Sequence, residues 1–225
     1  MGSGGRLRAG HPCPRSKRPT VCAVRVIARS KRGHTLVALR GTETRPTSDR
    51  VRENIFNLVG PLDGAKVLDL FAGSGALGIE ALSRGATRAV FVENDREAVR
   101  AIERNLEKLR LTGARVVRGD ALLTLAQEAM AGAKYDLVLV DPPYGMLDDI
   151  QPRLALHLPA LLAPDGVVVF ETDVRSEPEL PLPVRTSRKY GNTRVTLFEA
   201  ATGVGSTEPV KSGGPGMYGA GAEKP

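Results

Sequence analysis

The 225-residue sequence predicts a doubly wound α/β fold with about seven strands, mostly parallel and ending in an antiparallel hairpin. Mainly apolar runs such as Val67–Leu70 and Tyr135–Val140 suit strands that are buried on both faces. Segments with apolar residues at helical spacing, such as Arg96–Leu109, separate these runs. Strands that alternate with helices in this way favour a parallel sheet with helices on both sides.

The predicted elements begin with two short alternating strands that form a basic hairpin around Arg29–His34. A helix follows, which Thr47 or Ser48 can cap, and the last hairpin turns at Gly191–Asn192. In chain order, we expect strands at Arg25–Ala28, Thr35–Leu39, Val67–Leu70, Ala89–Val92, Ala114–Val117, Tyr135–Val140, Gly166–Glu171, Val184–Tyr190 and Thr193–Ala200, and helices at Arg50–Val59, Ala76–Arg84, Arg96–Leu109, Ala121–Met130 and Ile150–Leu162.

A glycine turn follows the strand Val67–Leu70, where Gly73, Gly75 and Gly78 have the spacing G-x-G-x-x-G. Glycines permit a tight turn and let a ligand approach the backbone, and the first amides of the next helix point at that ligand. Glu93 closes the next strand, 18 positions after Gly75, where a carboxylate can accept both ribose hydroxyls of an adenosine. NAD and S-adenosylmethionine both fit this pattern, so the turn alone does not distinguish a dehydrogenase from a methyltransferase.

A second motif, Asp141–Pro142–Pro143–Tyr144, follows the strand Tyr135–Val140 at the carboxyl end, where open α/β sheets bind their ligands. Its two prolines fix φ and prevent the strand from continuing. The turn therefore presents a carboxylate, a carbonyl and an aromatic ring in a rigid arrangement. These groups suit an extrahelical base with an exocyclic amine, because Asp141 and the Pro142 carbonyl can accept its hydrogens while Tyr144 stacks on the ring.

The net charge of +7 is unevenly distributed along the chain. Residues 1–52 contain 13 Lys and Arg against Glu43 and Asp49, a net charge of +11, whereas the remaining residues carry −4. A basic block of this kind indicates a phosphate-binding surface or a disordered arm. Residues 1–23 and the chain from Ala201 onward are rich in Gly, Pro and Ser without periodicity, so we expect both to be disordered.

The composition favours one globular domain with appendages, 41% hydrophobic and without Trp. No apolar run is long enough to cross a bilayer, and the first residues lack the apolar stretch of a signal peptide, so we expect a cytoplasmic protein with no membrane partner. Cys13 and Cys22 lie near His11, but a second ligand pair is missing, so we interpret them as free thiols and expect no metal.

Several sequence strings together resemble the bacterial ribosomal RNA guanine-N2 methyltransferases that act on 16S rRNA of the small subunit. The resemblance extends from about Val24 to Ala200. Relatives begin near a string matched here by Val24–Ile27, so residues 1–23 depart from the family and suggest a misassigned start. The matching strings are Asp69–Gly75, Asp141–Tyr144, Thr44–Glu53, Phe56–Asn57, Glu80–Ala86 and Tyr190–Thr193.

This resemblance implies a Rossmann-like class I methyltransferase sheet that binds S-adenosyl-L-methionine. It divides the chain into the extension 1–23, an RNA-binding hairpin and helix at 24–60, the methyltransferase domain 61–200 and the tail 201–225. As a bare residue, Asp120 can equally cap a helix. The implied residues are Asp141, Pro142, Pro143 and Tyr144 for catalysis; Asp69, Phe71, Gly73, Gly75, Glu93, Asn94, Asp120 and Ala121 for the cofactor; and Arg25, Arg32, Arg45, Thr47, Arg50 and Arg52 for RNA.

The expected reaction is methyl transfer from S-adenosylmethionine to the N2 amine of a guanine in 16S rRNA. We expect rRNA or a small-subunit assembly particle as the partner of a monomeric chain. An adenine-N6 methyltransferase uses the same logic at Asp141–Tyr144 and is the first alternative. A dinucleotide-dependent oxidoreductase would leave that motif without a role, and an RNA-binding module would leave both motifs without one.

Overall fold

The computed structural model describes residues 35–36, 48–143 and 145–201. In chain order the elements are α1 (Asp49–Val59), β1 (Lys66–Leu70), α2 (Ala76–Ser83), β2 (Arg88–Glu93), α3 (Arg96–Leu109), β3 (Ala114–Arg118), α4 (Ala121–Met130), β4 (Tyr135–Val140), α5 (Leu147–Leu161), β5 (Leu162–Asp173), β6 (Val184–Tyr190) and β7 (Thr193–Glu199). Within these ranges, none of the helices combines the length and the apolar character that a membrane crossing requires.

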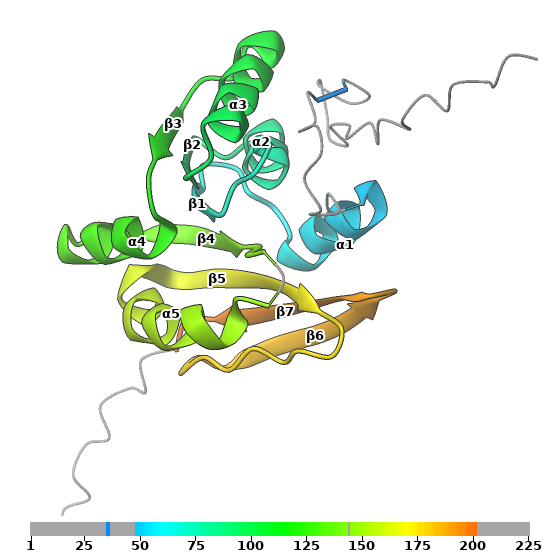
Figure 1. Cartoon of the computed structure of the whole chain (residues 1–225), viewed down its shortest axis with the longest axis vertical. Coiled ribbons are helices and arrows are strands. Elements are labelled where there is room, and N and C mark those ends of the chain that lie inside the picture. Colours follow the sequence, from blue (N-terminus) through cyan, green and yellow to red (C-terminus); the bar gives the residue numbers. More distant parts are fainter. Residues whose placement is uncertain (1–34, 37–47, 144, 202–225) are drawn as a thin grey trace, which may run out of the picture.

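The strands form one seven-stranded sheet in the order β3-β2-β1-β4-β5-β7-β6 (Figure 1). Strands β1 to β5 pair in parallel, and β7 is antiparallel to both of its neighbours. The order reverses direction between β1 and β4, which is where doubly wound sheets bind their ligands. The predicted fold class, including the antiparallel last strand, is therefore confirmed.

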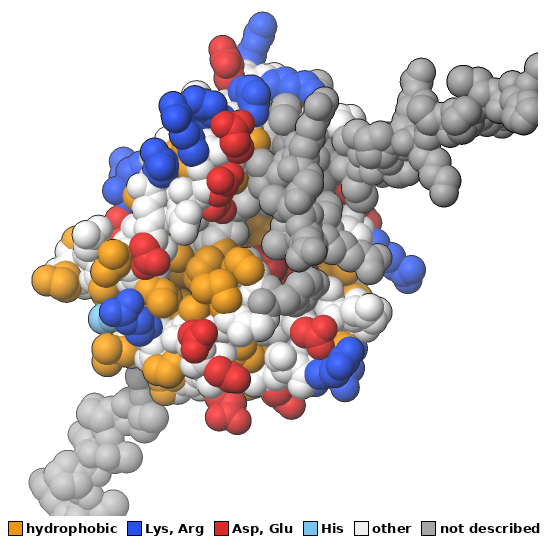
Figure 2. All heavy atoms as spheres, in the orientation of Figure 1, with side chains coloured by type: hydrophobic (Ala, Val, Ile, Leu, Met, Phe, Trp, Pro, Cys, Tyr) orange, Lys and Arg blue, Asp and Glu red, His pale blue; other side chains and the backbone are white. Residues whose placement is uncertain are grey.

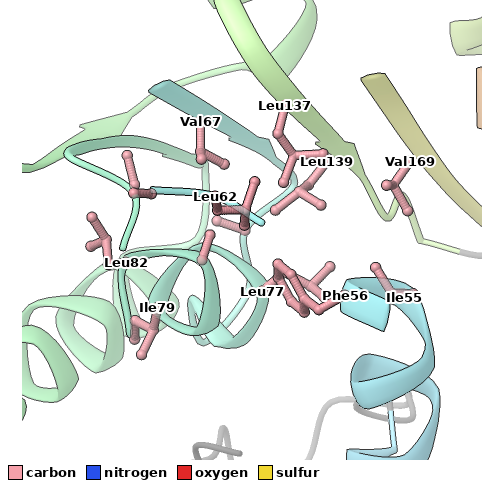
Figure 3. Packing of buried hydrophobic residues seen from close by; sticks show 14 of the residues in the cluster. Ile55, Phe56, Leu62, Val67, Leu77, Ile79, Leu82, Leu137, Leu139 and Val169 are labelled. Atoms are coloured by element: carbon pink, nitrogen blue, oxygen red, sulfur yellow. The ribbon is translucent and has the colours of Figure 1, made fainter. Parts of the chain in front are cut away.

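Helices cover the sheet on both faces, as the two buried clusters show. One cluster joins residues of α1, α2 and α3 to one side of the strands, and the other joins α4 and α5 to the opposite side. Figure 3 shows Ile55 and Phe56 of α1 pointing toward Leu77 of α2 and Val169 of β5. Helix α1 thus shares its core with the sheet, and the division of the chain at residue 60 stays a prediction.

Most predicted elements agree with the structure to within one or two residues, and α3, α4, β4 and β6 have the predicted bounds. Helix α5 begins at Leu147, earlier than the predicted Ile150, and β5 begins at Leu162 instead of Gly166. The start of β5 is irregular: its register on β4 shifts between Tyr135 and Leu137, and Asp165 has a φ of +61°. Of the predicted N-terminal hairpin, only Thr35 and Leu36 lie within the described residues.

On the face that Figure 2 shows, the exposed side chains differ in character from one region to another. Hydrophobic side chains gather over α4 and α5, whereas Lys and Arg side chains gather over α3 with Asp and Glu between them. Three of the exposed large apolar residues agree with this view, since Leu123 and Met130 belong to α4 and Leu156 to α5. Helix α3 therefore presents mixed charges to solvent and its buried face to the sheet.

Candidate active site

The carboxyl ends of β1, β2 and β4 lie at one edge of the sheet, because these strands are parallel neighbours. The register pairs Leu70, the last residue of β1, with Val92 on one side and Val140 on the other. The glycine turn follows Leu70 directly, Glu93 follows Val92, and Asp141 follows Val140. The structure therefore brings both predicted motifs together at the strand-order switch.

The glycine turn between β1 and α2 has a distinctive backbone. Phe71, Gly73 and Gly75 have φ values of +60°, +55° and +79°. A positive φ is rare at an aromatic residue and marks local strain, which tends to occur at functional turns. No heavy atom of the residues that the structure describes lies within 4 Å of a Cβ built at Gly73, so these residues leave space beside it for a ligand. The Ala72 N–H donates to the Val92 carbonyl at 3.0 Å, which holds the turn against β2.

Gly78, the third glycine, has a packing role. A Cβ built on it would lie 2.3 Å from a ring carbon of Phe91, a fully buried residue of β2. Gly78→Ala is therefore expected to lower the free energy of unfolding by about 1–3 kcal/mol, because the ring or the helix must shift. Urea denaturation measures this loss. Gly119→Ala is the control, since its Cβ would meet Thr124 at an ordinary 3.6 Å; equal losses for the two variants would contradict the packing role.

Glu93 forms the hydrogen-bonding centre of the turn. Its carboxylate accepts three backbone N–H groups: Oε2 from Gly73 at 2.7 Å, and Oε1 from Asn94 and Asp95 at 2.8 Å each. The side chain is half-buried. Asn94 contributes this backbone contact, and its role toward a cofactor stays a prediction. Glu93 thereby links the end of β2 to the glycine turn through bonds within the chain itself.

Asp69 lies in β1 beneath the same turn and is 1% exposed. Its Oδ2 accepts the Gly78 N–H at 2.9 Å, which ties β1 to the first turns of α2. Burial raises the pKa of this carboxyl to about 8 against the opposing effect of the Gly78 bond, and the negative charges of Asp141 and Glu93 raise the pKa further. At pH 7 the Asp69 side chain is therefore mostly neutral.

The Asp141–Pro142–Pro143 turn lies beside Asp69. Asp141 and Pro142 are half-buried and Pro143 is exposed. The effect of Asp141 on the pKa of Asp69 places the two carboxyls within electrostatic range of each other. The Pro143 carbonyl accepts the Met146 N–H at 3.4 Å, which closes the turn before α5. Tyr144 lies outside the described residues, so its stacking role stays a prediction.

Asp120 lies at the carboxyl end of β3, the strand next to β2. Its Oδ1 accepts the Leu123 N–H at 2.8 Å, so the prediction that it caps a helix is confirmed for α4. The residue is exposed, and Gly119 before it donates to the Glu93 carbonyl at 3.0 Å. Ala121 is buried behind it. The contact of Asp120 with a cofactor stays a prediction.

The predicted RNA-binding residues fall into two groups. Arg25, Arg32, Arg45 and Thr47 lie outside the described residues. Of the other two, Arg50 is exposed on α1, but Arg52 is fully buried, and its Nη2 donates to Asp49 at 2.8 Å. Arg52 shares the buried face of α1 with Ile55 and Phe56, three and four positions on. Arg52 therefore lies within the buried face of α1, and its contact with RNA stays a prediction.

Sequence reasoning missed Asn105. This residue of α3 is fully buried, and its Nδ2 donates to the carbonyl of Ser74 in the glycine turn at 3.1 Å. The available signal was a polar amide on the apolar face of an amphipathic helix, between Ile102 and Leu109. A buried amide requires hydrogen-bond partners, so such a position indicates a specific contact.

The site's donors and acceptors fit an adenosine cofactor. A carboxylate has about four acceptor positions, and Glu93 uses three of them on the backbone, which leaves room for a ribose hydroxyl. Asp120 uses only Oδ1 for capping and Gly73 borders open space. Among the described residues, no group of three or more His, Cys, Asp or Glu side chains could hold a metal ion.

Comparisons with known proteins agree on one family. The family model Conserved hypothetical protein 95 matches residues 24–199. The Bacillus subtilis protein YlbH is 41% identical over 192 residues, which cover 78% of this chain and 98% of YlbH. The Escherichia coli ribosomal RNA small subunit methyltransferase D is 39% identical over 156 residues, covering 68% of this chain and 76% of that protein.

A solved structure extends this likeness to the fold. The Escherichia coli protein yhhF superposes with a TM-score of 0.69 at 36% sequence identity, covering 79% of this chain and 98% of that one. The family model alone covers most of the chain, including both turns of the candidate site. The chain therefore belongs to the Conserved hypothetical protein 95 family, and one of its relatives is a methyltransferase of small-subunit ribosomal RNA.

Proposed function

We propose that this protein transfers a methyl group from S-adenosylmethionine to the N2 amine of a guanine in 16S ribosomal RNA. The observation that carries the proposal is the meeting of two turns at one sheet edge: the glycine turn tied to Glu93, and Asp141–Pro142–Pro143 after β4. The first suits an adenosine and the second suits a planar base with an exocyclic amine. A methyltransferase of small-subunit rRNA that is 39% identical supports the same substrate class.

The cofactor's place follows from the acceptors around the glycine turn. Glu93 is proposed to accept a ribose hydroxyl at its remaining acceptor position and Asp120 the adenine amine, while the open side of Gly73 lets the ligand approach the backbone. Asp69 is mostly neutral and holds α2 through Gly78, so it supports the turn without adding a full negative charge beside Asp141.

Chemistry at the base depends on positioning. The guanine N2 amine is a poor nucleophile because its lone pair is delocalised into the ring. We assign to Asp141 and the Pro142 carbonyl the role of accepting the amine's hydrogens, which turns its lone pair toward the methyl donor. Tyr144 is proposed to stack on the base. The cofactor supplies a methyl group already activated on a sulfonium.

We infer the partner as ribosomal RNA, without distinguishing free rRNA from an assembling small subunit. An rRNA substrate accounts for the basic N-terminal block, of which Arg50 is exposed on the described part of α1. A free 16S rRNA and an assembling small subunit are both compatible with this surface, and a monomeric, cytoplasmic enzyme is part of the proposal.

The direct test is methylation in vitro, with purified protein, S-adenosylmethionine and 16S rRNA or small-subunit particles, followed by mass spectrometry of the nucleosides. Formation of N2-methylguanosine supports the proposal. Formation of N6-methyladenosine would favour the adenine alternative. Calorimetry with S-adenosylhomocysteine and with NAD separates a methyltransferase from a dinucleotide-dependent oxidoreductase, and binding of neither would favour an RNA-binding module.

Glu93→Ala is expected to weaken binding of S-adenosylhomocysteine by about 1–3 kcal/mol, because it removes a charged acceptor from the ribose and releases three backbone N–H groups. Isothermal titration calorimetry measures this change. Binding to RNA should stay the same, since Glu93 lies in the glycine-turn half of the site. An unchanged affinity for S-adenosylhomocysteine would remove Glu93 from the cofactor site.

A further inference from the structure

The peptide between Ser74 and Gly75 is held at both of its polar atoms. The Ser74 carbonyl accepts the Asn105 side chain at 3.1 Å, and the Gly75 N–H donates to the Ala72 carbonyl at 2.7 Å. The C=O and N–H of one trans peptide point in opposite directions. Bonds at both ends therefore fix the orientation of this peptide plane within the turn.

This peptide needs such a restraint because of the residue that follows it. Gly75 has a φ of +79° and no side chain, so sterics alone do not select one orientation of the preceding peptide. A peptide that precedes such a glycine can rotate, because glycine tolerates both positive and negative φ. The bond from Asn105 distinguishes the two orientations, since the Ser74 carbonyl can reach Asn105 in only one of them.

Helix α3 is packed for this contact. Ile102 and Asn105 lie one turn apart on its buried face. The Ile102 Cγ1 would lie 3.1 Å from a Cβ at Gly75, so the helix touches the turn closely. Helix α3 also starts from the segment that Glu93 holds, because Glu93 accepts the Asp95 N–H and Asp95 caps the helix through Ala98. One rigid helix thus connects the ribose acceptor to the turn.

We propose that Asn105 is a positioning residue for the cofactor: by fixing the Ser74–Gly75 peptide, it holds the glycine turn in the shape that binds S-adenosylmethionine. The proposal rests on the proposed function, because it assigns the turn to that cofactor. Asn105 itself is buried under the turn and acts through the backbone. Its expected effect is on cofactor affinity and leaves RNA affinity unchanged.

The test is Asn105→Leu, which keeps a similar side-chain volume and removes the donor. Isothermal titration with S-adenosylhomocysteine should show binding weaker by about tenfold to about a hundredfold, the range for an unsatisfied buried acceptor. Two controls are matched to this change. Leu109→Ala destabilises the same helix at a residue that is 1% exposed, and Asn54→Leu removes an amide bond to the Arg50 carbonyl in α1.

The outcomes separate positioning from mere stability. If Asn105→Leu weakens binding while Leu109→Ala lowers the melting temperature with cofactor affinity retained, the positioning role is supported. Equal affinities for Asn105→Leu and Leu109→Ala would overturn it. If the wild-type chain binds no S-adenosylhomocysteine, the proposed function fails instead, which is a different result.

A second measurement needs no variant. In the wild-type chain, NMR hydrogen exchange should show strong protection of the Gly75 amide, because its bond to Ala72 depends on the fixed peptide. Rapid exchange of that amide would overturn the proposal even if Asn105→Leu does not fold.

If Asn105→Leu does not fold, Asn105→Ser and Asn105→Ala replace it. Asn105→Ser keeps a hydrogen-bond donor, so it should lose less affinity for S-adenosylhomocysteine than Asn105→Ala.

Discussion

Replacing Asp141 with alanine is expected to reduce the rate of rRNA methylation by about a thousandfold, since orientation of the amine and stabilisation of its developing charge are together worth several kcal/mol. Affinity for S-adenosylhomocysteine should change little, because the acceptors proposed for the cofactor lie at the glycine turn and at the ends of β2 and β3. Single-turnover kinetics with saturating cofactor and 16S rRNA measure the rate, and calorimetry measures the affinity. The loss therefore should appear in the chemical step.

The control for this experiment is Asp148→Ala. Asp148 is an exposed carboxylate in the first turn of α5, close in sequence to the catalytic turn. Asp148→Ala removes one carboxylate, as Asp141→Ala does. If both variants lost methylation rate, the cause would be the change in surface charge. Near-normal turnover of Asp141→Ala, with wild-type affinity for RNA, would refute the role of Asp141 in positioning the amine.

The sheet could be predicted because its strands follow a simple rule. Apart from Asp69 and Asp136, Val67–Leu70 and Tyr135–Val140 are apolar, and all of their residues except Asp136 are buried, while α3 has its apolar residues at helical spacing. The start of β5 could not be predicted in the same way. Residues 163–166 interrupt its pairing with β4, and Asp165 adopts a left-handed φ. The string Pro164–Asp165–Gly166 is a local turn signal, which favours a strand that begins after it and does not reveal that Leu162 already pairs with Tyr135.

The candidate site shows a similar division. The positions of Gly73, Gly75 and Glu93 at the turn could be predicted, because their spacing relative to the strands is that of a nucleotide-binding motif. Arg52 is buried although a charge usually favours solvent, because it lies three residues before Ile55 on α1; its RNA contact stays a prediction. The contact of Asn105 with Ser74 spans 31 residues, and no local pattern encodes which turn of the chain a buried amide meets.

The pH dependence of stability should carry a signature of Asp69. Its pKa is raised from 3.8 to about 8, mainly by burial. Between these values the folded chain binds one more proton at this site than the unfolded chain does. The contribution of Asp69 to the free energy of unfolding is therefore fully present below the pKa of the unfolded chain. It decreases by about 1.4 kcal/mol per pH unit as the pH rises toward the pKa of the folded chain. Urea denaturation from pH 5 to pH 8 measures this slope.

Asp69→Asn should remove that slope and make the chain more stable than the wild type at pH 8. The asparagine carries no proton to lose, and its Oδ1 can still accept the Gly78 N–H that Asp69 accepts at 2.9 Å. Asp136→Asn is the matched control, because Asp136 also lies on a central strand and accepts one backbone N–H, from Lys66 at 2.7 Å, but is exposed. Its variant should keep the wild-type slope. If Asp69→Asn kept it too, the titrating group would be another residue, and Asp69 would be ionised beneath the glycine turn.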